Sequence, residues 1–315
     1  MNSKFILDHF GVDVDTYLEA LKMSPSAQGY ILGSISEILL KRYLEKREYE
    51  VVRIKEKPSG GYNAKNYEAR GDFYIRKKNK WGNDEWLVVE SKGLKSNSEF
   101  RGSKLDSPKK VYNFLKSKIF DHNRSNERIY KKSYSTYLKI KRKWERANPG
   151  NVFPEFKCNK EFPGPETFYL KGLWNSEKDL IEWINSFSEY YFTEEAYRKI
   201  DGIITILETH QPSKRKGIVT GIEQAAPLVY DFNIMCVDLF LRTRKHEFVF
   251  MNSEEISHSP TSPEHLYQNY TIDILVKDLK PIPVIQRPWY RNIEDCIKIT
   301  KPSFRSMDES QVDIR

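Results

Sequence analysis

The chain of 315 residues is poor in cysteine and contains no long apolar run. Its three cysteines lie far apart in the sequence: Cys158, Cys236 and Cys296. This odd, scattered set excludes a disulfide framework and a cysteine-rich zinc site, and it is typical of a reducing compartment. A membrane-spanning helix needs about eighteen consecutive apolar residues, and a secretory signal needs an apolar core near the N-terminus. Because the sequence has neither, we expect a cytoplasmic protein.

Several catalytic signatures are missing as well. None of the six histidines belongs to an H-E-x-x-H pair, and the sequence has no G-x-S-x-G elbow. The glycine pattern of a dinucleotide-binding turn is absent, and the glycine-containing stretch of residues 55–70 lacks the G-K-[ST] ending of a phosphate-binding loop. These absences exclude the common signatures of zinc proteases, serine hydrolases, dehydrogenases and P-loop enzymes.

Positive charge is present in excess. The formal net charge is +8, and residues 101–150 contain 15 Lys or Arg against 4 Asp or Glu. Basic side chains neutralise phosphates and release counterions, so a block of this kind favours nucleic-acid binding. The alternative is an amphipathic helix over residues 128–144 whose charges only face water.

Residues 68–93 predict two short strands, 71–76 and 86–90, joined by a polar turn. Glu90 and Lys92 lie on one face, because residues two apart on a strand point the same way, and the hairpin can bring Asp72 beside them. Two carboxylates can hold a hard cation such as Mg²⁺, and a nearby lysine can orient water or offset charge. The alternative is that Glu90 and Lys92 form only the solvated exit of a strand.

Glu37 is a further candidate. Ser24 and Pro25 predict the start of a helix that runs to about residue 46. Glu37 lies on an apolar stripe of this helix, where a carboxylate is unusual. A strand over residues 49–54 is expected to follow. The alternative is that Glu37 is an exposed helix-forming residue.

These segments resemble a known family. G-S-I-S-E-I-L-L-K-R-Y-L, G-D-F and V-V-E-S-K-G are similar to the core of the PD-(D/E)xK nuclease superfamily, and among its members to type II restriction endonucleases. The resemblance covers residues 27–120. It implies an α/β fold with a restriction-endonuclease-like core, a central mixed β-sheet flanked by helices, and additional helical and β elements in the C-terminal half. Gly71 stands where the family's motif has proline, a position that varies.

The resemblance also implies roles for single residues. Asp72 and Glu90 match the acids that hold Mg²⁺, helped by the Ser91 carbonyl, Lys92 matches the catalytic lysine, and Glu37 matches an acid on the first helix. The implied activity is Mg²⁺-dependent, sequence-specific cleavage of double-stranded DNA to 5′-phosphate and 3′-hydroxyl ends in a prokaryotic cell. A structure-directed repair or recombination nuclease and a non-catalytic DNA-binding protein are the alternatives.

The rest of the chain is expected to serve DNA binding. Residues 1–146 are predicted to form the catalytic core with a helical lead-in, and residues 147–315 to complete the core, recognise DNA and form a homodimer contact. A cognate DNA methyltransferase is expected in the same cell, and no membrane partner is expected. The candidate DNA-binding residues are basic side chains near the acid–lysine set in the sequence: Lys65, Arg70, Lys95, Arg101, Lys104, Lys109 and Lys110.

Periodicity predicts the remaining elements. Helices are expected over residues 108–122 and 176–187, strands over 202–207 and 270–276, and a hairpin over 232–251. Residues 210–217 predict a basic loop. The last dozen residues predict a loose tail.

Overall fold

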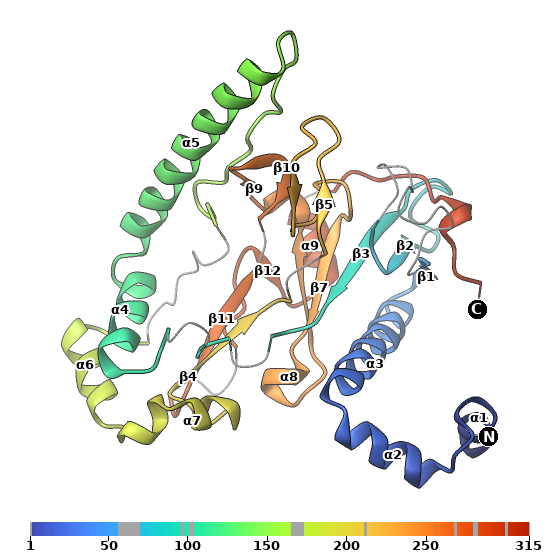
Figure 1. Ribbon diagram of the computed structural model, residues 1–315, viewed down its shortest axis with the longest axis horizontal. Coiled ribbons are helices and arrows are strands. Elements are labelled where there is room, and N and C mark those ends of the chain that lie inside the picture. The colour runs from blue at the N-terminus through green and yellow to red at the C-terminus, as the bar shows by residue number, and fades with distance from the viewer. Residues whose placement is uncertain are drawn as a thin grey trace. The chain divides into compact units, whose positions relative to one another are not determined.

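The computed structural model describes residues 2–55, 70–95, 98–100, 104–164, 173–210, 213–267, 270–279, 283–299 and 302–314. Contacts within the chain divide it into two units, Met1–Glu48 and Tyr49–Arg315. Each unit has its own architecture (Figure 1). Among the described residues, no helix combines the length and the apolar character needed to cross a membrane.

The first unit is helical and contains α1 (Asn2–Phe10), α2 (Val14–Met23) and α3 (Pro25–Glu45). Asp13 caps α2, because its Oδ1 accepts a hydrogen bond from Thr16 N at 2.7 Å. Ser24 caps α3 through Ala27 N at 3.4 Å, and Pro25 occupies the first turn, where its missing N–H costs nothing. The helix predicted to start at Ser24 is confirmed.

A six-stranded sheet forms the centre of the second unit. Its strands are β1 (Tyr49–Arg53), β2 (Phe73–Lys77), β3 (Leu87–Lys92), β7 (Ile234–Asp238), β8 (Phe248–Asn252) and β12 (Trp289–Tyr290), in that spatial order. The first three form an antiparallel meander, β7 pairs with β3 in parallel, and β8 and β12 continue antiparallel. The sheet is therefore mixed.

The β2–β3 hairpin forms where the sequence predicts it. Phe73 to Ile75 and Leu87 to Val89 are all buried, as expected for strands covered on both faces. The register pairs Phe73 with Val89 and Ile75 with Leu87. Asn79 in the connecting turn has φ +59°, a left-handed conformation that asparagine tolerates better than most residues.

Shorter strands pair outside this sheet: β4 (Ile204–Glu208) with β11 (Thr271–Val276), β5 (Arg215–Lys216) with β6 (Glu223–Gln224), and β9 (His258–Ser259) with β10 (Ser262–Leu266). The β4–β11 pair meets the central sheet just beyond β3. Leu94 forms a β-bridge with Thr209, and Lys95 N donates to Glu208 O at 2.7 Å. The chain leaving β3 therefore runs along the end of β4.

Helices flank the second unit: α4 (Pro108–Ile119), α5 (His122–Ala147), α6 (Glu177–Asn185), α7 (Glu194–Arg198), α8 (Phe240–Thr243) and α9 (Ile293–Ile299). Figure 1 shows α4, α6 and α7 beside β4 and β11, and these elements share one buried cluster that includes Leu115, Leu180, Tyr197, Ile204 and Ile274. The expected α/β class, with a mixed central sheet flanked by helices, is confirmed. The domain boundary predicted at residue 147 falls inside the second unit, because β7 and β8 complete the sheet that β1 to β3 begin.

The C-terminal tail is fixed on the sheet, so the expectation of a loose tail was wrong. Arg305 forms a β-bridge with Trp86, and Val312 forms one with Ile54. Gln311 is buried, and its Oε1 accepts a hydrogen bond from Tyr74 OH at 2.9 Å. The tail satisfies backbone groups that the edge of the meander would otherwise leave unpaired.

Candidate active site

Two carboxylates face each other at the end of the β2–β3 hairpin. The ladder ends with Phe73 paired to Val89, and the next residues along the two segments are Asp72 and Glu90. Asp72 N donates to Val89 O at 2.9 Å, so Asp72 lies against β3 just beyond the last pair of the ladder. The charge of Glu90 acts on Asp72 from this short range. The structure therefore brings the two predicted acids together.

The ionised form of Asp72 is unfavourable in this position. Burial, and then the charge of Glu90, raise the pKa of Asp72 from 3.8 to about 7. Ser91 N donates to Asp72 Oδ2 at 2.6 Å, and this bond and the charge of Lys92 lower the pKa without cancelling the rise. The positive charges and hydrogen-bond donors around Asp72 and Glu90 therefore do not fully compensate the negative charge of the two carboxylates when both are ionised.

Lys92 completes the predicted set. Its Nζ forms a hydrogen-bonded ion pair with Glu90 Oε1, and only 19% of the Lys92 side chain and 12% of the Glu90 side chain are exposed. Burial lowers the pKa of Lys92, but the charge and hydrogen bond of Glu90 outweigh burial, so this pKa lies above its ordinary value. Lys92 is therefore an ammonium ion at neutral pH. It can donate hydrogen bonds and offset negative charge, but it cannot accept a proton.

Close packing requires glycine at position 71. A Cβ atom there would lie 2.4 Å from Val88 Cγ1 and 2.8 Å from Val89 O, closer than real Cβ contacts allow. Proline would meet the same obstacles. The close passage of the chain beside β3 just before Asp72 therefore requires glycine at this position.

A third acid that the sequence analysis missed, Asp231, lies near this set. Its Oδ1 accepts a hydrogen bond from Arg215 Nη2 at 2.7 Å, and its Oδ2 accepts one from Leu228 N at 2.8 Å. Its carbonyl accepts one from Arg70 N at 2.9 Å. Burial raises the pKa of Asp231, while the charges of Arg215, Arg70 and Lys92 act in the opposite direction. Its position just before the buried strand β7 was the available signal, but the hydrogen bond from Arg70 N, in a distant part of the sequence, ties it to the residues that lead into Asp72.

The donor set fits a hard divalent cation. Carboxylate oxygens are the ligands that Mg²⁺ prefers. The raised pKa of Asp72 indicates that an additional positive charge beside the acid pair would stabilise its ionised form. Ser91, whose carbonyl was predicted as a further ligand, lies between Glu90 and Lys92 on β3. Within the part of the chain that the structure describes, no three His, Cys, Asp or Glu side chains form a metal-binding cluster. A cation at this position would rely on the two carboxylates, backbone oxygen and water.

Arg70 is the predicted DNA-binding residue closest in sequence to the acid pair. Its Nε is buried and has no hydrogen-bond partner among the described residues. Lys65 and Arg101 lie outside the described residues. Glu37 belongs to α3 in the first unit, and its catalytic role stays a prediction.

Lys95 and Lys104 both bind the carboxylate of Glu208. Their Nζ atoms lie 3.7 Å and 3.1 Å from its two oxygens, and the Glu208 side chain is only 5% exposed. These lysines therefore neutralise a buried acid, which leaves less of their charge for DNA. Lys109 and Lys110 are exposed in the first turn of α4, where Lys110 pairs with Asp106 at 2.7 Å.

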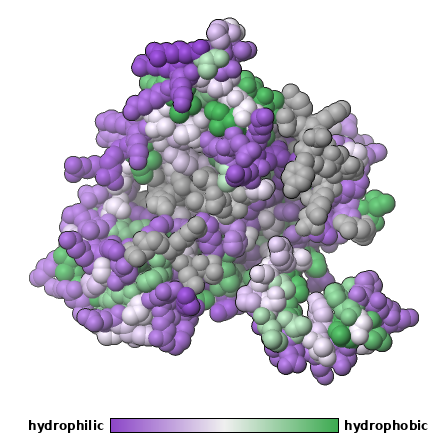
Figure 2. All heavy atoms as spheres, in the orientation of Figure 1, coloured by the Kyte–Doolittle hydropathy of each residue, from purple (hydrophilic) through white to green (hydrophobic). Residues whose placement is uncertain are grey.

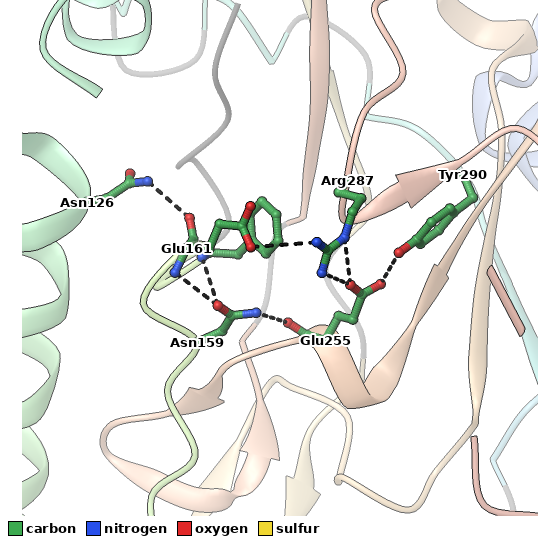
Figure 3. Close-up of polar contacts among 7 residues, drawn as sticks. Asn126, Asn159, Glu161, Glu255, Arg287 and Tyr290 are labelled. Carbon is green, nitrogen blue, oxygen red and sulfur yellow. Dashed lines mark hydrogen bonds and ion pairs between the residues drawn. The ribbon is translucent and has the colours of Figure 1, made fainter. Parts of the chain in front are cut away.

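A separate cavity of about 630 Å³ lies between the start of α5 and residues 160–162 and 286–287. Figure 3 shows the polar network at its wall, where Arg287 donates to Glu255 Oε1 from Nε and Nη2 at 3.2 and 2.7 Å. Tyr290 OH donates to Glu255 Oε2 at 2.6 Å, and Asn126 Nδ2 donates to Glu161 O at 3.0 Å. The network stiffens this wall, and none of its residues belongs to the acid–lysine set.

Comparison of the chain with protein-family models, with curated proteins and with solved structures finds no match.

Proposed function

We propose that the protein is a Mg²⁺-dependent endonuclease that cleaves double-stranded DNA at a specific sequence, as type II restriction enzymes do. One observation carries the proposal: the half-buried carboxylates of Asp72 and Glu90 lie together at the end of the β2–β3 hairpin, the pKa of Asp72 is raised to about 7, and Lys92 stays charged beside them. Uncompensated buried carboxylates destabilise a fold, and perturbed pKa values of this kind gather at functional sites.

Each residue of the set has a role in hydrolysis. Asp72 and Glu90 would hold the cation, which when bound neutralises phosphate charge and lowers the pKa of water. Lys92, kept as an ammonium ion by Glu90, orients the attacking water and stabilises the negative charge that develops on the phosphate. Ser91 N–H fixes Asp72 by its 2.6 Å hydrogen bond. In-line attack would leave 5′-phosphate and 3′-hydroxyl ends.

Fold and charge support the same proposal. The mixed sheet flanked by helices is of the kind that the resemblance to PD-(D/E)xK nucleases implies. The surplus of 11 basic residues in the block 101–150 suits a polyanionic substrate.

A homodimer belongs to the proposal, because a two-fold symmetric pair matches a palindromic DNA site. Large apolar side chains on α1 and α2 are exposed and would suit a subunit contact: Phe5, Leu7, Phe10 and Leu18. A sequence-specific nuclease of this class would also need a companion methyltransferase to protect the DNA of its own cell.

The test is to incubate the purified protein with unmethylated, phage-length duplex DNA and Mg²⁺, and to sequence the ends. We expect discrete fragments whose ends share one short motif. Cutting only at junctions or flaps would indicate a structure-directed nuclease. Binding at low salt without cleavage in either Mg²⁺ or Mn²⁺ would indicate a non-catalytic DNA-binding protein.

A further inference from the structure

The hairpin formed by β5 and β6 begins with Arg215 and Lys216, from the basic loop that the sequence predicted over residues 210–217; residues 211 and 212 of that loop lie outside the described residues. Its Arg215 is held by Asp231 at 2.7 Å, and Asp231 also binds the backbone of Arg70, two residues before Asp72. These bonds tie one end of the hairpin to the edge of the candidate active site.

Other contacts fix the turn of the same hairpin. Glu264 on β10 accepts hydrogen bonds from Val219 N at 2.8 Å and Thr220 N at 2.9 Å. Thr220 O accepts one from Trp144 Nε1, on α5, at 3.1 Å. Ile222 of the hairpin packs against the buried cluster that contains Tyr137 of α5. The hairpin is thus fastened to α5 as well as to the active-site edge.

The C-terminal half of α5, which contains Trp144, has a row of basic side chains. Lys139, Arg142, Lys143 and Arg146 are all exposed, and their spacing of three or four residues puts them on one face of the helix. None of the four forms an ion pair with a described residue. Figure 1 shows the hairpin and this end of α5 projecting on the same side of the sheet, and Figure 2 shows hydrophilic residues gathered over that end.

We propose that the hairpin and the C-terminal half of α5 form one surface that binds the phosphate backbone of duplex DNA and leads it to the acid pair. We call it the hairpin–helix surface, and its basic residues are Lys139, Arg142, Lys143, Arg146, Lys214 and Lys216. This second proposal rests on the proposed function, because it identifies the part of the protein that would hold the DNA substrate.

The dimensions suit a duplex. From residue 139 to residue 146 the helix rises about 10 Å, a length over which duplex DNA carries about six phosphate charges. Lys216 on the hairpin is exposed and forms no ion pair with a described residue, while Lys214 pairs with Glu223 at 3.4 Å on the surface. An exposed pair of that kind is weak enough for phosphate to displace. Backbone contacts position the duplex but do not read its sequence.

The test measures affinity for a labelled duplex in Ca²⁺ without Mg²⁺, over a series of salt concentrations. Arg142→Gln/Lys143→Gln and Lys216→Gln are compared with Lys178→Gln/Lys199→Gln, which neutralises two exposed lysines on α6 and next to α7. We expect the control to match the wild type. Each lost phosphate contact should lower the salt slope by about 0.9 and the affinity at 0.1 M salt by roughly five- to tenfold.

An unchanged affinity and slope in both surface variants would overturn the proposal, as would displacement of the duplex by poly-glutamate as readily as by unlabelled duplex. The readout needs no cleavage, so it separates the two proposals. Weaker binding by these variants would support the surface even if the wild-type protein did not cut DNA. If these variants bound DNA as tightly as the wild type and the wild type cleaved DNA, the hairpin–helix surface would be wrong as the binding site, while the nuclease proposal would stand.

Discussion

Burial and the neighbouring Glu90 carboxylate raise the pKa of Asp72 to about 7. The native state therefore binds a proton more tightly at this site than the unfolded chain, whose aspartates ionise near pH 3.8. Between these two values the native state holds more protons, so its stability falls as the pH rises. Above about pH 7 the native state bears the full cost of a buried, repelled charge.

We predict that Asp72→Asn stabilises the metal-free protein and that the gain grows from pH 5 to pH 8. The amide keeps an oxygen for Ser91 N–H but has no charge to lose, so the gain reaches a few kcal/mol at pH 8. Urea unfolding in EDTA at both pH values measures it. Asp84→Asn, on the exposed turn between β2 and β3, is the control and should change little. A larger gain at pH 5 than at pH 8 would contradict the assigned cause.

Gly71 gives a second prediction at the scale of one residue. Gly71→Ala places a Cβ 2.4 Å from Val88 Cγ1 and 2.8 Å from Val89 O, and the strand must shift to accept it. We expect a loss of about 1–3 kcal/mol in the free energy of unfolding, with slower DNA cleavage because Asp72 moves too. Gly82→Ala is the matched control, since the nearest heavy atom there would be Glu85 Cγ at 3.4 Å. Equal behaviour of the two variants in thermal melts and cleavage assays would contradict this account.

Elements with a strong local pattern could be predicted from the sequence. The Ser24 cap and the apolar stripe that follows indicated α3, and two buried runs around a polar turn indicated the β2–β3 hairpin, including the approach of Asp72 to Glu90. These features depend on residues that are close along the chain. The pairing of β3 with β7 depends on residues far apart in the sequence, and no periodicity encodes it. Asp231 was missed for a similar reason, because its hydrogen bond with Arg70 N also joins residues that are far apart in the sequence.

The C-terminal tail was missed for a related reason. Its composition is polar, but Gln311 is buried and its side chain accepts a hydrogen bond from Tyr74 OH. The β-bridges of the tail involve Trp86 and Ile54. A polar segment that adds to a sheet edge has no apolar alternation to reveal it.

We predict that Gln311→Ala destabilises the protein by about 1–3 kcal/mol, because Tyr74 OH would lose the Gln311 acceptor in a buried position. Thermal or urea unfolding measures the change. Glu309→Ala, in the same short helical turn, removes an exposed side chain and should stay within about 0.5 kcal/mol of the wild type. A tail that is loose in solution would make the two variants indistinguishable.

For the molecule as a whole, the proposed function gives complementary roles to the basic charge and to the acid pair. In the proposed function, the surplus of positive charge would attract duplex DNA, backbone contacts would position it, and Asp72, Glu90 and Lys92 would cut it. The net charge of +8 favoured a polyanionic partner, but it did not indicate which lysines are available to bind one. Lys95 and Lys104 neutralise Glu208, whereas Lys139 and Arg142 face solvent.

A parallel comparison of cleavage and binding for Asp72→Ala tests whether the acid pair is the active site of a nuclease. Cleavage of duplex DNA is followed in Mg²⁺, and affinity for the same duplex is measured in Ca²⁺, with Glu85→Ala in the nearby turn as the control. We predict that Asp72→Ala binds DNA at least as tightly as the wild type and loses cleavage by a factor of a thousand or more, on the order of 4 kcal/mol of transition-state stabilisation. Wild-type rates of cleavage by Asp72→Ala would show that the acid pair is not the active site.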